Sequence, residues 1–281
     1  MSANYFFIHR KSIIISIIAF CLFFIGQSAI SQTGLQFTSA SSQYVTFGQA
    51  MSLATQNFTV EVWFKRTATG TTVSTGTGGV TLVPLVAKGA GEAEGSVVDA
   101  NYILGIRSSD NVLAADFEEG TGSASPGLNH PIAGITVITN NVWYHAAATF
   151  ANGVFKLYLN GNLENTLTLA TTVWPQGAST QHAGLATTLN SSGARAGYFA
   201  GVLDEPRIWN YARTQQQIQD NMSLEVTSGT GLLGRWGLNE NTGTTVANSV
   251  AGGPNGTFST SAPVWTAMPA IPTAPSGLSA T

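Results

Sequence analysis

The sequence Gly201-Val-Leu-Asp-Glu-Pro-Arg-Ile-Trp-Asn-Tyr-Ala-Arg213 combines the features of a buried β-strand with an acidic pair. Its apolar residues include Ile208 and Trp209, which are typical of a strand that contributes to a core. Asp204 and Glu205 interrupt this apolar set, and the stretch ends in a polar turn. Because a buried carboxylate needs hydrogen-bond donors, a cation or a metal, the segment predicts a core strand and also a candidate site.

Other segments alternate between apolar and polar residues with the period of a β-strand. In residues 58–65 the even-numbered residues are apolar, and the odd-numbered ones include Thr59, Glu61 and Lys65. This period predicts a strand with one buried face. Similar runs predict strands at residues 83–87, 102–107, 112–117, 143–150, 154–159 and 197–209, with final strands within 231–238 and 256–265.

Turn signals separate these runs. Asn152-Gly153 and Asn160-Gly161 mark turns, the second being a hairpin signal. One short helix is expected at residues 214–222, where Thr214 is placed to cap it. Many short strands and almost no helical period predict an all-β fold, a two-sheet antiparallel β-sandwich.

The first 31 residues have the pattern of a secretory signal peptide. A basic cluster at residues 9–11 precedes an apolar run at 13–25, and Ala29 and Ser31 have the spacing of a signal-peptidase site. A transmembrane anchor is the alternative, but the run is shorter than the roughly 20 apolar residues that a span needs. We therefore expect a secreted or cell-surface protein that does not insert into the membrane after cleavage.

Charge and cysteine content narrow the classes of partner. Removing the signal changes the formal net charge from −3 to −5, because the signal carries Arg10 and Lys11 and no acidic residue. This charge does not favour binding to nucleic acid or to an anionic membrane. Cys21, the one cysteine of the chain, lies within the signal. The rest of the chain must therefore be stabilised by its core or by a metal, and not by a disulfide.

Several segments, in their order along the chain, resemble a laminin-G-like (LamG-like, concanavalin A-type) jelly roll. They are residues 35–37, 43–45, 58–63, 143–150, 156–161, 201–213 and 234–243. The resemblance implies a jelly-roll domain over residues 32–267. A proline-rich linker at 268–275 follows, and residues 276–281 resemble the start of a fibronectin type III domain. We therefore expect the chain to be part of a larger modular protein.

The resemblance also implies a calcium site. Related jelly rolls hold calcium through an aspartate in the last core strand, which here is Asp204, with help from the N-terminal segment, here residues 37–43. Calcium prefers six to eight oxygen ligands, and residues 37–43 contain no carboxylate. The alternative is that Asp204 accepts backbone hydrogen bonds while Glu205 pairs with Arg207 or a neighbouring residue. A second acidic cluster, residues 116–119, is a weaker metal candidate.

The sequence does not favour an enzyme. A glycosidase on this fold needs two carboxylates facing each other across a cleft. Laminarinase-type relatives supply them in a Glu-x-Asp-x-x-Glu pattern, which this chain lacks. His130, His145 and His182 have no zinc-ligand spacing, and no Gly-x-Ser-x-Gly motif supports a serine nucleophile. We therefore expect no catalytic residues.

Aromatic residues are the expected ligand contacts, because a flat ring matches the apolar face of a sugar. Trp174 stands beside a proline in a loop, and Tyr198 and His182 are its expected neighbours in a ligand site. Trp143, Trp209 and Trp236 are expected in the core. Long irregular regions at residues 67–79 and 118–134 are candidates for binding surface.

The function hypothesis that follows is a noncatalytic extracellular module. Its ligand would be a polysaccharide, a glycoconjugate or an extracellular protein. One alternative is a structural spacer without a specific ligand, and another is a diverged glycoside hydrolase. An exposed aromatic groove would favour binding, whereas two facing carboxylates in a cleft would favour the hydrolase.

Overall fold

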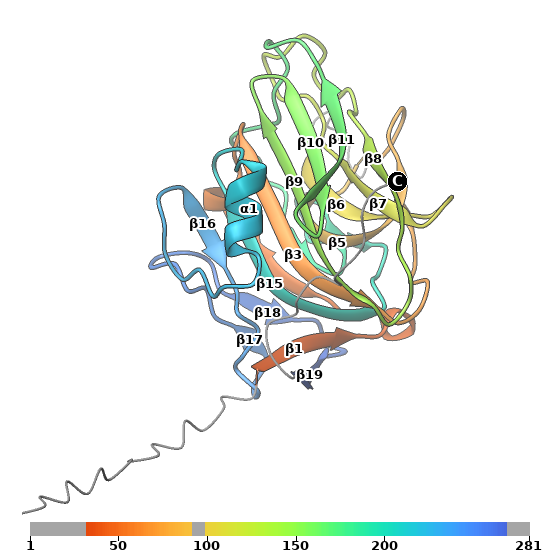
Figure 1. Cartoon of the computed structure of the whole chain (residues 1–281), viewed down its shortest axis with the longest axis vertical. Coiled ribbons are helices and arrows are strands. Elements are labelled where there is room, and N and C mark those ends of the chain that lie inside the picture. Colours follow the sequence, from red (N-terminus) through yellow and green to blue (C-terminus); the bar gives the residue numbers. More distant parts are fainter. Residues whose placement is uncertain (1–31, 92–98, 269–281) are drawn as a thin grey trace, which may run out of the picture. The chain divides into compact units, whose positions relative to one another are not determined.

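The computed structural model describes residues 32–91 and 99–268, so the expected signal peptide and the fibronectin-like segment lie outside it. Of the expected linker only Met268 is described, and it ends the last strand. Every named strand pair is antiparallel, and the strands form two sheets (Figure 1). The predicted all-β sandwich is confirmed.

The first sheet, sheet A, is built around the strand that carries the acidic pair. Its order is β11 (Asn162–Thr168), β10 (Val154–Leu159), β9 (Trp143–Ala151), β3 (Phe58–Arg66), β15 (Gly201–Trp209), β1 (Gln32–Phe37) and β19 (Val264–Met268), with β16 (Leu232–Arg235) beside β15. β15 lies inside sheet A, and this position explains why its apolar residues have the pattern of a core strand.

The second sheet, sheet B, contains the strands that line the candidate pockets. Its order is β17 (Thr245–Val246), β18 (Gly256–Phe258), β2 (Val45–Gly48), β12 (Ala183–Leu185), β5 (Thr81–Gly89), β6 (Ala100–Arg107), β7 (Val112–Asp116) and β8 (Ile132–Val137), joined by β4 (Val73–Ser74), β13 (Thr188–Leu189) and β14 (Arg195–Ala196). Two 3-10 turns, η1 (Ser39–Ser41) and η2 (Met51–Leu53), flank β2.

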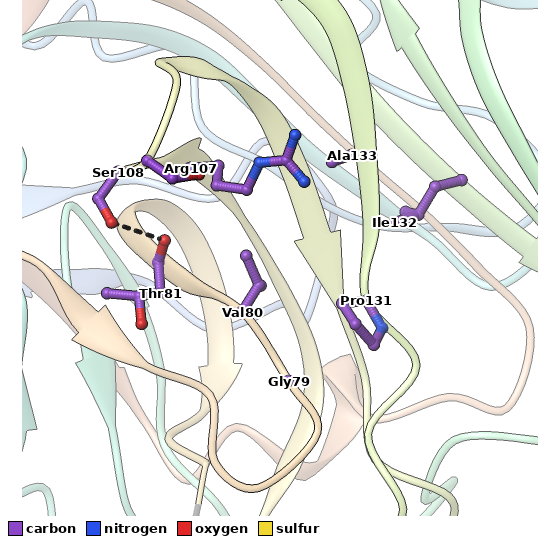
Figure 2. A pocket seen from close by; sticks show the side chains of 9 residues that line it. Gly79, Val80, Thr81, Arg107, Ser108, Pro131, Ile132 and Ala133 are labelled. Atoms are coloured by element: carbon purple, nitrogen blue, oxygen red, sulfur yellow. Dashed lines mark hydrogen bonds between the residues drawn. The ribbon is translucent and has the colours of Figure 1, made fainter.

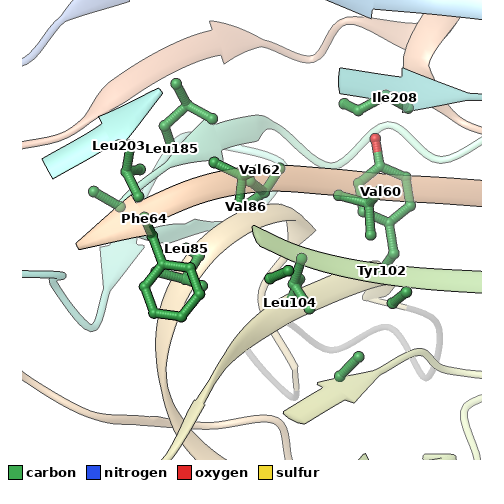
Figure 3. Packing of buried hydrophobic residues seen from close by; sticks show 14 of the residues in the cluster. Val60, Val62, Phe64, Leu85, Val86, Tyr102, Leu104, Leu185, Leu203 and Ile208 are labelled. Carbon is green, nitrogen blue, oxygen red and sulfur yellow. The ribbon is translucent and has the colours of Figure 1, made fainter. Parts of the chain in front are cut away.

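The main core lies between the two sheets. Val60, Val62 and Phe64 of β3 point toward residues of β5 and β6, and all three are fully buried (Figure 3). The odd-numbered residues of β3 point to the outer face of sheet A, as the alternation predicts. Trp236 belongs to this core, but Trp143 does not, because it is half-buried and lies beneath the Lys65 ammonium at 5.4 Å from the ring centroid.

The turns and the helix form where their residues predict. Asn160 and Gly161 both have positive φ, which the tight connection between β10 and β11 requires. Helix α1 (Gln215–Asn221) begins after Thr214, whose side chain accepts from the Gln217 N–H in a capping box. Ile218 of α1 is buried on the outer face of sheet A. Within residues 32–91 and 99–268, no helix has the length and apolar character that a membrane span requires.

Candidate functional site

The acidic pair lies at a β-bulge of the central strand β15. The pairing of β15 with β3 slips between Asp204 and Arg207, and Glu205 adopts a left-handed φ of 52°. A bulge of this kind redirects side chains within a strand. Asp204 and Glu205 are both buried, so each requires a partner.

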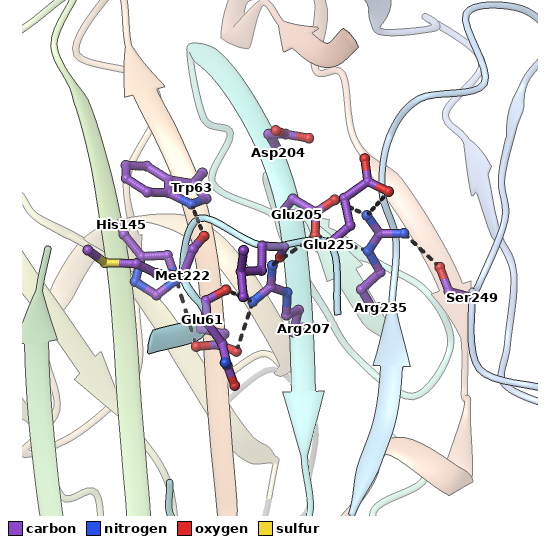
Figure 4. Close-up of polar contacts among 12 residues, drawn as sticks. Glu61, Trp63, His145, Asp204, Glu205, Arg207, Met222, Glu225, Arg235 and Ser249 are labelled. Atoms are coloured by element: carbon purple, nitrogen blue, oxygen red, sulfur yellow. Dashed lines mark hydrogen bonds and ion pairs between the residues drawn. The ribbon is translucent and has the colours of Figure 1, made fainter. Parts of the chain in front are cut away.

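Glu205 is paired with two arginines (Figure 4). Arg207 Nη2 lies 3.0 Å from Glu205 Oε2, and Arg235 Nε donates to the same oxygen at 2.9 Å. The Nη2 group of Arg235 donates to Glu205 Oε1. The expected pairing of Glu205 with Arg207 is thus found, and Arg235 is an additional partner that came from a distant part of the sequence.

A second buried carboxylate on the outer face of sheet A extends this network. Glu61 of β3 accepts from Arg213 Nη1 at 2.8 Å and from the Trp209 indole N–H at 2.9 Å. Burial alone would raise the pKa of Glu61, but the charges of Arg207 and Arg213 lower it overall. Burial lowers the pKa of His145, whose Nε2 lies 3.7 Å from Glu61, to about 4. The same arginines donate to backbone carbonyls of α1 and of the segment after it, which attaches both to sheet A.

Asp204 has a different environment from Glu205. Its Oδ2 accepts from the Gln32 amide at 3.2 Å, whereas Oδ1 is buried without a hydrogen-bond partner in the described structure. Burial, followed by the nearby charge of Glu205, raises the pKa of Asp204 well above its usual range.

The Oδ1 atom of Asp204, which has no hydrogen-bond partner in the described structure, fits the chemistry of a cation ligand. The side-chain amide oxygen of Gln32 could join it as a second ligand after an amide flip. Glu205 cannot, because two arginines hold it. Nowhere in the described part of the chain do three or more His, Cys, Asp or Glu side chains gather as a metal-binding group. Calcium at Asp204 therefore stays a prediction.

The second acidic cluster is engaged by protein donors. Asp116 accepts from the Thr75 hydroxyl at 2.5 Å, and Glu118 accepts from the backbone N–H at the start of β6 at 2.7 Å. Glu119 Oε1 lies 2.8 Å from His130 Nε2. These contacts connect β7 to the irregular segments on both sides, which gives the cluster a structural role.

The three residues expected to contact ligand lie in separate surroundings. Trp174 is half-buried and packs against the main core. Tyr198 is half-buried and pairs with Thr71 through two backbone hydrogen bonds of 2.8 Å. His182 lines a pocket on sheet B. Trp174 and Tyr198 do not line that pocket.

We call this cavity of about 380 Å³ the Tyr44 pocket. It is lined by Tyr44, Thr46, Phe47, Gly48, His182, Leu189, Gly193, Asn255 and Thr257. Thr46 of β2 pairs with Thr257 of β18 on one side and with Gly184 of β12 on the other. Val45 and Phe47, the alternate residues of β2, belong to the core, so Thr46 points to the outer face of sheet B.

Two local structures shape the Tyr44 pocket. The Asn190 side chain accepts from the backbone N–H groups of Ser192 and Ala194, which fixes the turn that carries Gly193. Behind the pocket, the buried Lys88 ammonium donates to the carbonyls of Gln49 and Gln181 at 2.6 and 2.7 Å, and burial lowers its pKa to about 8. Both carbonyls adjoin lining residues, so Lys88 holds two walls of the pocket together.

The groups that line the Tyr44 pocket suit a neutral polyhydroxyl ligand. The Arg195 guanidinium lies 5.7 Å from the centroid of the Tyr44 ring and supports it at the edge of the pocket. Two threonine hydroxyls, the Asn255 amide and the His182 imidazole can donate or accept hydrogen bonds. Sequence reasoning missed this pocket, because its strands come from opposite ends of the domain.

Comparisons with known proteins agree with the fold. A laminin-G family model, described as the concanavalin A-like lectin/glucanases superfamily, matches residues 39–219. A Bacteroides ovatus protein provisionally named as carbohydrate-binding is 18% identical, with a TM-score of 0.57 over 85% of this chain and 60% of its own. Tailspike protein 2 of the Escherichia coli O157:H7 bacteriophage CAB120 is 16% identical, with a TM-score of 0.50 over 73% of this chain and 26% of its own.

The chain spans less than two thirds of the length of either solved protein. A search of curated proteins found no match. At these identities the two structures support the fold alone. The family model covers more than half of the chain. The chain therefore belongs to the concanavalin A-like lectin/glucanases superfamily.

Proposed function

We propose that the chain is a noncatalytic, extracellular glycan-binding module and that the Tyr44 pocket is its binding site. The observation that carries the proposal is the composition of this pocket, in which the aromatic rings of Tyr44 and Phe47 stand beside hydroxyl, amide and imidazole groups. A sugar ring offers an apolar C–H face for the aromatic side chain and hydroxyls for the polar groups. A volume of about 380 Å³ lies within the range of about 300 to 1,000 Å³ that is typical of small-molecule sites.

The noncatalytic part of the proposal rests on the carboxylates. Glycoside hydrolysis needs two of them facing each other. The residues that line the Tyr44 pocket include no aspartate or glutamate, and Glu61 and Glu205 of the opposite sheet are held in buried ion pairs. The signal pattern of residues 1–31 supports the extracellular setting, and the resemblance of residues 276–281 to the start of a fibronectin type III domain supports a place within a larger secreted or surface protein.

A glycan array followed by calorimetric titration of the hits tests the proposal. Tyr44→Ala should weaken binding about tenfold or more, because it removes the ring that packs on the sugar. Tyr44→Phe keeps the ring and should retain most of the affinity. Asn255→Ala should weaken binding with only a small fall in the thermal midpoint, because the hydrogen bond that its side chain accepts from the Asn248 N–H is exposed.

Two control variants compare the Tyr44 pocket with the aromatic contacts expected from sequence. Tyr198→Ala and Trp174→Ala alter aromatic residues that do not line the pocket. If either abolishes binding while Tyr44→Ala keeps it, the site lies elsewhere. No binding to any glycan would contradict the proposal and favour the spacer hypothesis.

A further inference from the structure

A second pocket lies on sheet B and shares no lining residue with the Tyr44 pocket. It is lined by residues 79–81, 107–109 and 131–133 and has a volume of about 360 Å³ (Figure 2). We call it the Arg107 pocket. It joins the start of β5, the end of the adjacent strand β6 and the start of β8, which β7 separates from β6, so three strands of one sheet hold its walls.

One side of the Arg107 pocket is apolar. Val80, Pro131 and Ala133 line it, and Val80 and Ala133 pack in one apolar cluster, whereas the Ile132 side chain belongs to the main core. In Figure 2 the Arg107 side chain extends toward Ala133, so its guanidinium lies close to this apolar wall. Ser108, Ser109 and the guanidinium make up the polar side. A sugar ring, with an apolar face and a polar edge, matches this two-sided lining.

Arg107 is the one charged residue among the nine that line the pocket, and the neighbouring Asp110 balances its charge. Its Nε and Nη2 bind Asp110 at 2.9 and 2.5 Å, and these bonds hold the guanidinium in place. The Nη1 group has no hydrogen-bond partner among the described residues, so it can donate to an added anion. A guanidinium already held in position binds a carboxylate or sulfate with less loss of side-chain entropy.

The loops that form the walls are joined by one buried carboxylate. Asp116 Oδ2 accepts from the Thr75 hydroxyl at 2.5 Å, and Oδ1 accepts from the His130 N–H at 2.9 Å. Thr75 in turn bonds Val80, and His130 precedes Pro131, so these contacts position both walls. A Cβ added at Gly79 would lie 2.1 Å from the Thr75 hydroxyl oxygen, so this wall has no room for a side chain.

We propose that the Arg107 pocket is a second saccharide site, selective for sugars that carry a carboxylate or a sulfate. The inference does not depend on the Tyr44 pocket, because the two share no lining residue. Arg107 binds the anionic group, and the apolar wall packs against the sugar ring. The module would then recognise neutral and acidic sugars at separate places on one sheet.

The test is an NMR titration of the full chain with methyl β-glucuronide, glucose 6-sulfate and, as the uncharged match, methyl β-glucoside. The charged sugars should bind at least fivefold more tightly than the glucoside at low salt, and the difference should shrink as salt is raised. Arg107→Gln should weaken the charged sugars at least tenfold and bring them to the level of the glucoside. Comparison of the two charged probes shows which anion the guanidinium prefers.

Arg195→Gln is the matched control, because it removes the same charge at the Tyr44 pocket. It should leave binding of the charged sugars unchanged. Arg107→Gln should fold, since an exposed ion pair contributes little to stability, and its thermal midpoint verifies this. The proposal is overturned if the charged sugars bind no better than the glucoside, if Arg107→Gln binds them normally, or if Arg195→Gln weakens them as much. Tyr44→Ala should not change these affinities.

Discussion

Asp116 should make the stability of the domain depend on pH between about 4 and 7. The carboxyl is fully buried, and burial raises its pKa from 3.8 to about 7. In the unfolded chain it ionises near 4, so between these values the folded state holds a proton that the unfolded state has released. The stability that this group contributes is therefore present below pH 4 and is lost as pH rises through 7.

The magnitude follows from the two pKa values. One pKa unit corresponds to about 1.4 kcal/mol, so a rise from 3.8 to about 7 is worth about 4 kcal/mol at most. Asp116→Asn removes the ionisation. The amide oxygen can still accept from the Phe117 and His130 N–H groups, and the amide N–H can donate to the Thr75 oxygen. The Thr75 hydroxyl can then donate to the Val80 carbonyl, which lies 3.1 Å away.

Urea denaturation of both proteins at pH 4, 5.5, 7 and 8.5 measures the effect. The free energy of unfolding of Asp116→Asn should rise relative to that of the wild type as pH increases, by up to about 4 kcal/mol. Other titrating groups, including His145 and Lys88, cancel in this difference. Asp110→Asn is the control, because Asp110 is exposed and should not produce the rise. Parallel pH profiles for wild type and Asp116→Asn would refute the reasoning.

Three further predictions concern the outer face of sheet A and the acidic pair. Glu205→Ala should destabilise the fold by about 3 to 5 kcal/mol in urea denaturation, because it leaves two buried guanidiniums without their carboxylate. Glu225 is half exposed, so the control Glu225→Ala should cost less than about 1 kcal/mol. Thr214→Ala should cost about 1 kcal/mol in the same assay, because it removes the cap of α1. Calcium should raise the thermal midpoint and EDTA should reverse the gain, while Asp204→Asn should not respond. If neither calcium nor EDTA changes the thermal midpoint of the wild type, the calcium prediction is wrong.

The fold could be predicted because its strands and turns satisfy local rules. β3 alternates strictly, and the Asn160-Gly161 turn has a conformation that few other residue pairs adopt. Two strands that the sequence did not reveal, β11 and β8, lie at the edges of the sheets. β11 is almost wholly polar and exposed, and β8 is half exposed, so neither has an apolar period. Pairing with a neighbour, and not side-chain pattern, makes these segments strands.

The site was less predictable because its parts are distant in sequence. The acidic pair stood out in the chain, yet the main partner of Glu205, Arg235, is brought beside it only by the pairing of β16 with β15. In the same way Thr46 and Thr257 meet through the pairing of β2 with β18. Trp174 stood out as a loop aromatic, but packing against the core half-buries it. Long-range pairing is what local sequence patterns do not contain.

The distribution of buried charge explains why ligand binding is proposed on sheet B. On the outer face of sheet A, Glu61 and Glu205 are held by arginines that also bind backbone carbonyls of the segment after α1. Moving that segment aside to admit a ligand would break hydrogen bonds that the buried Arg207 guanidinium donates to the carbonyls of Asn221 and Leu224, and each such bond to a charged group is worth about 1.5 to 3 kcal/mol. The Tyr44 and Arg107 pockets of sheet B are already formed, so a weakly binding sugar does not have to offset such a cost. Sheet A thus carries the buried ion pairs, and the two proposed binding sites lie on sheet B.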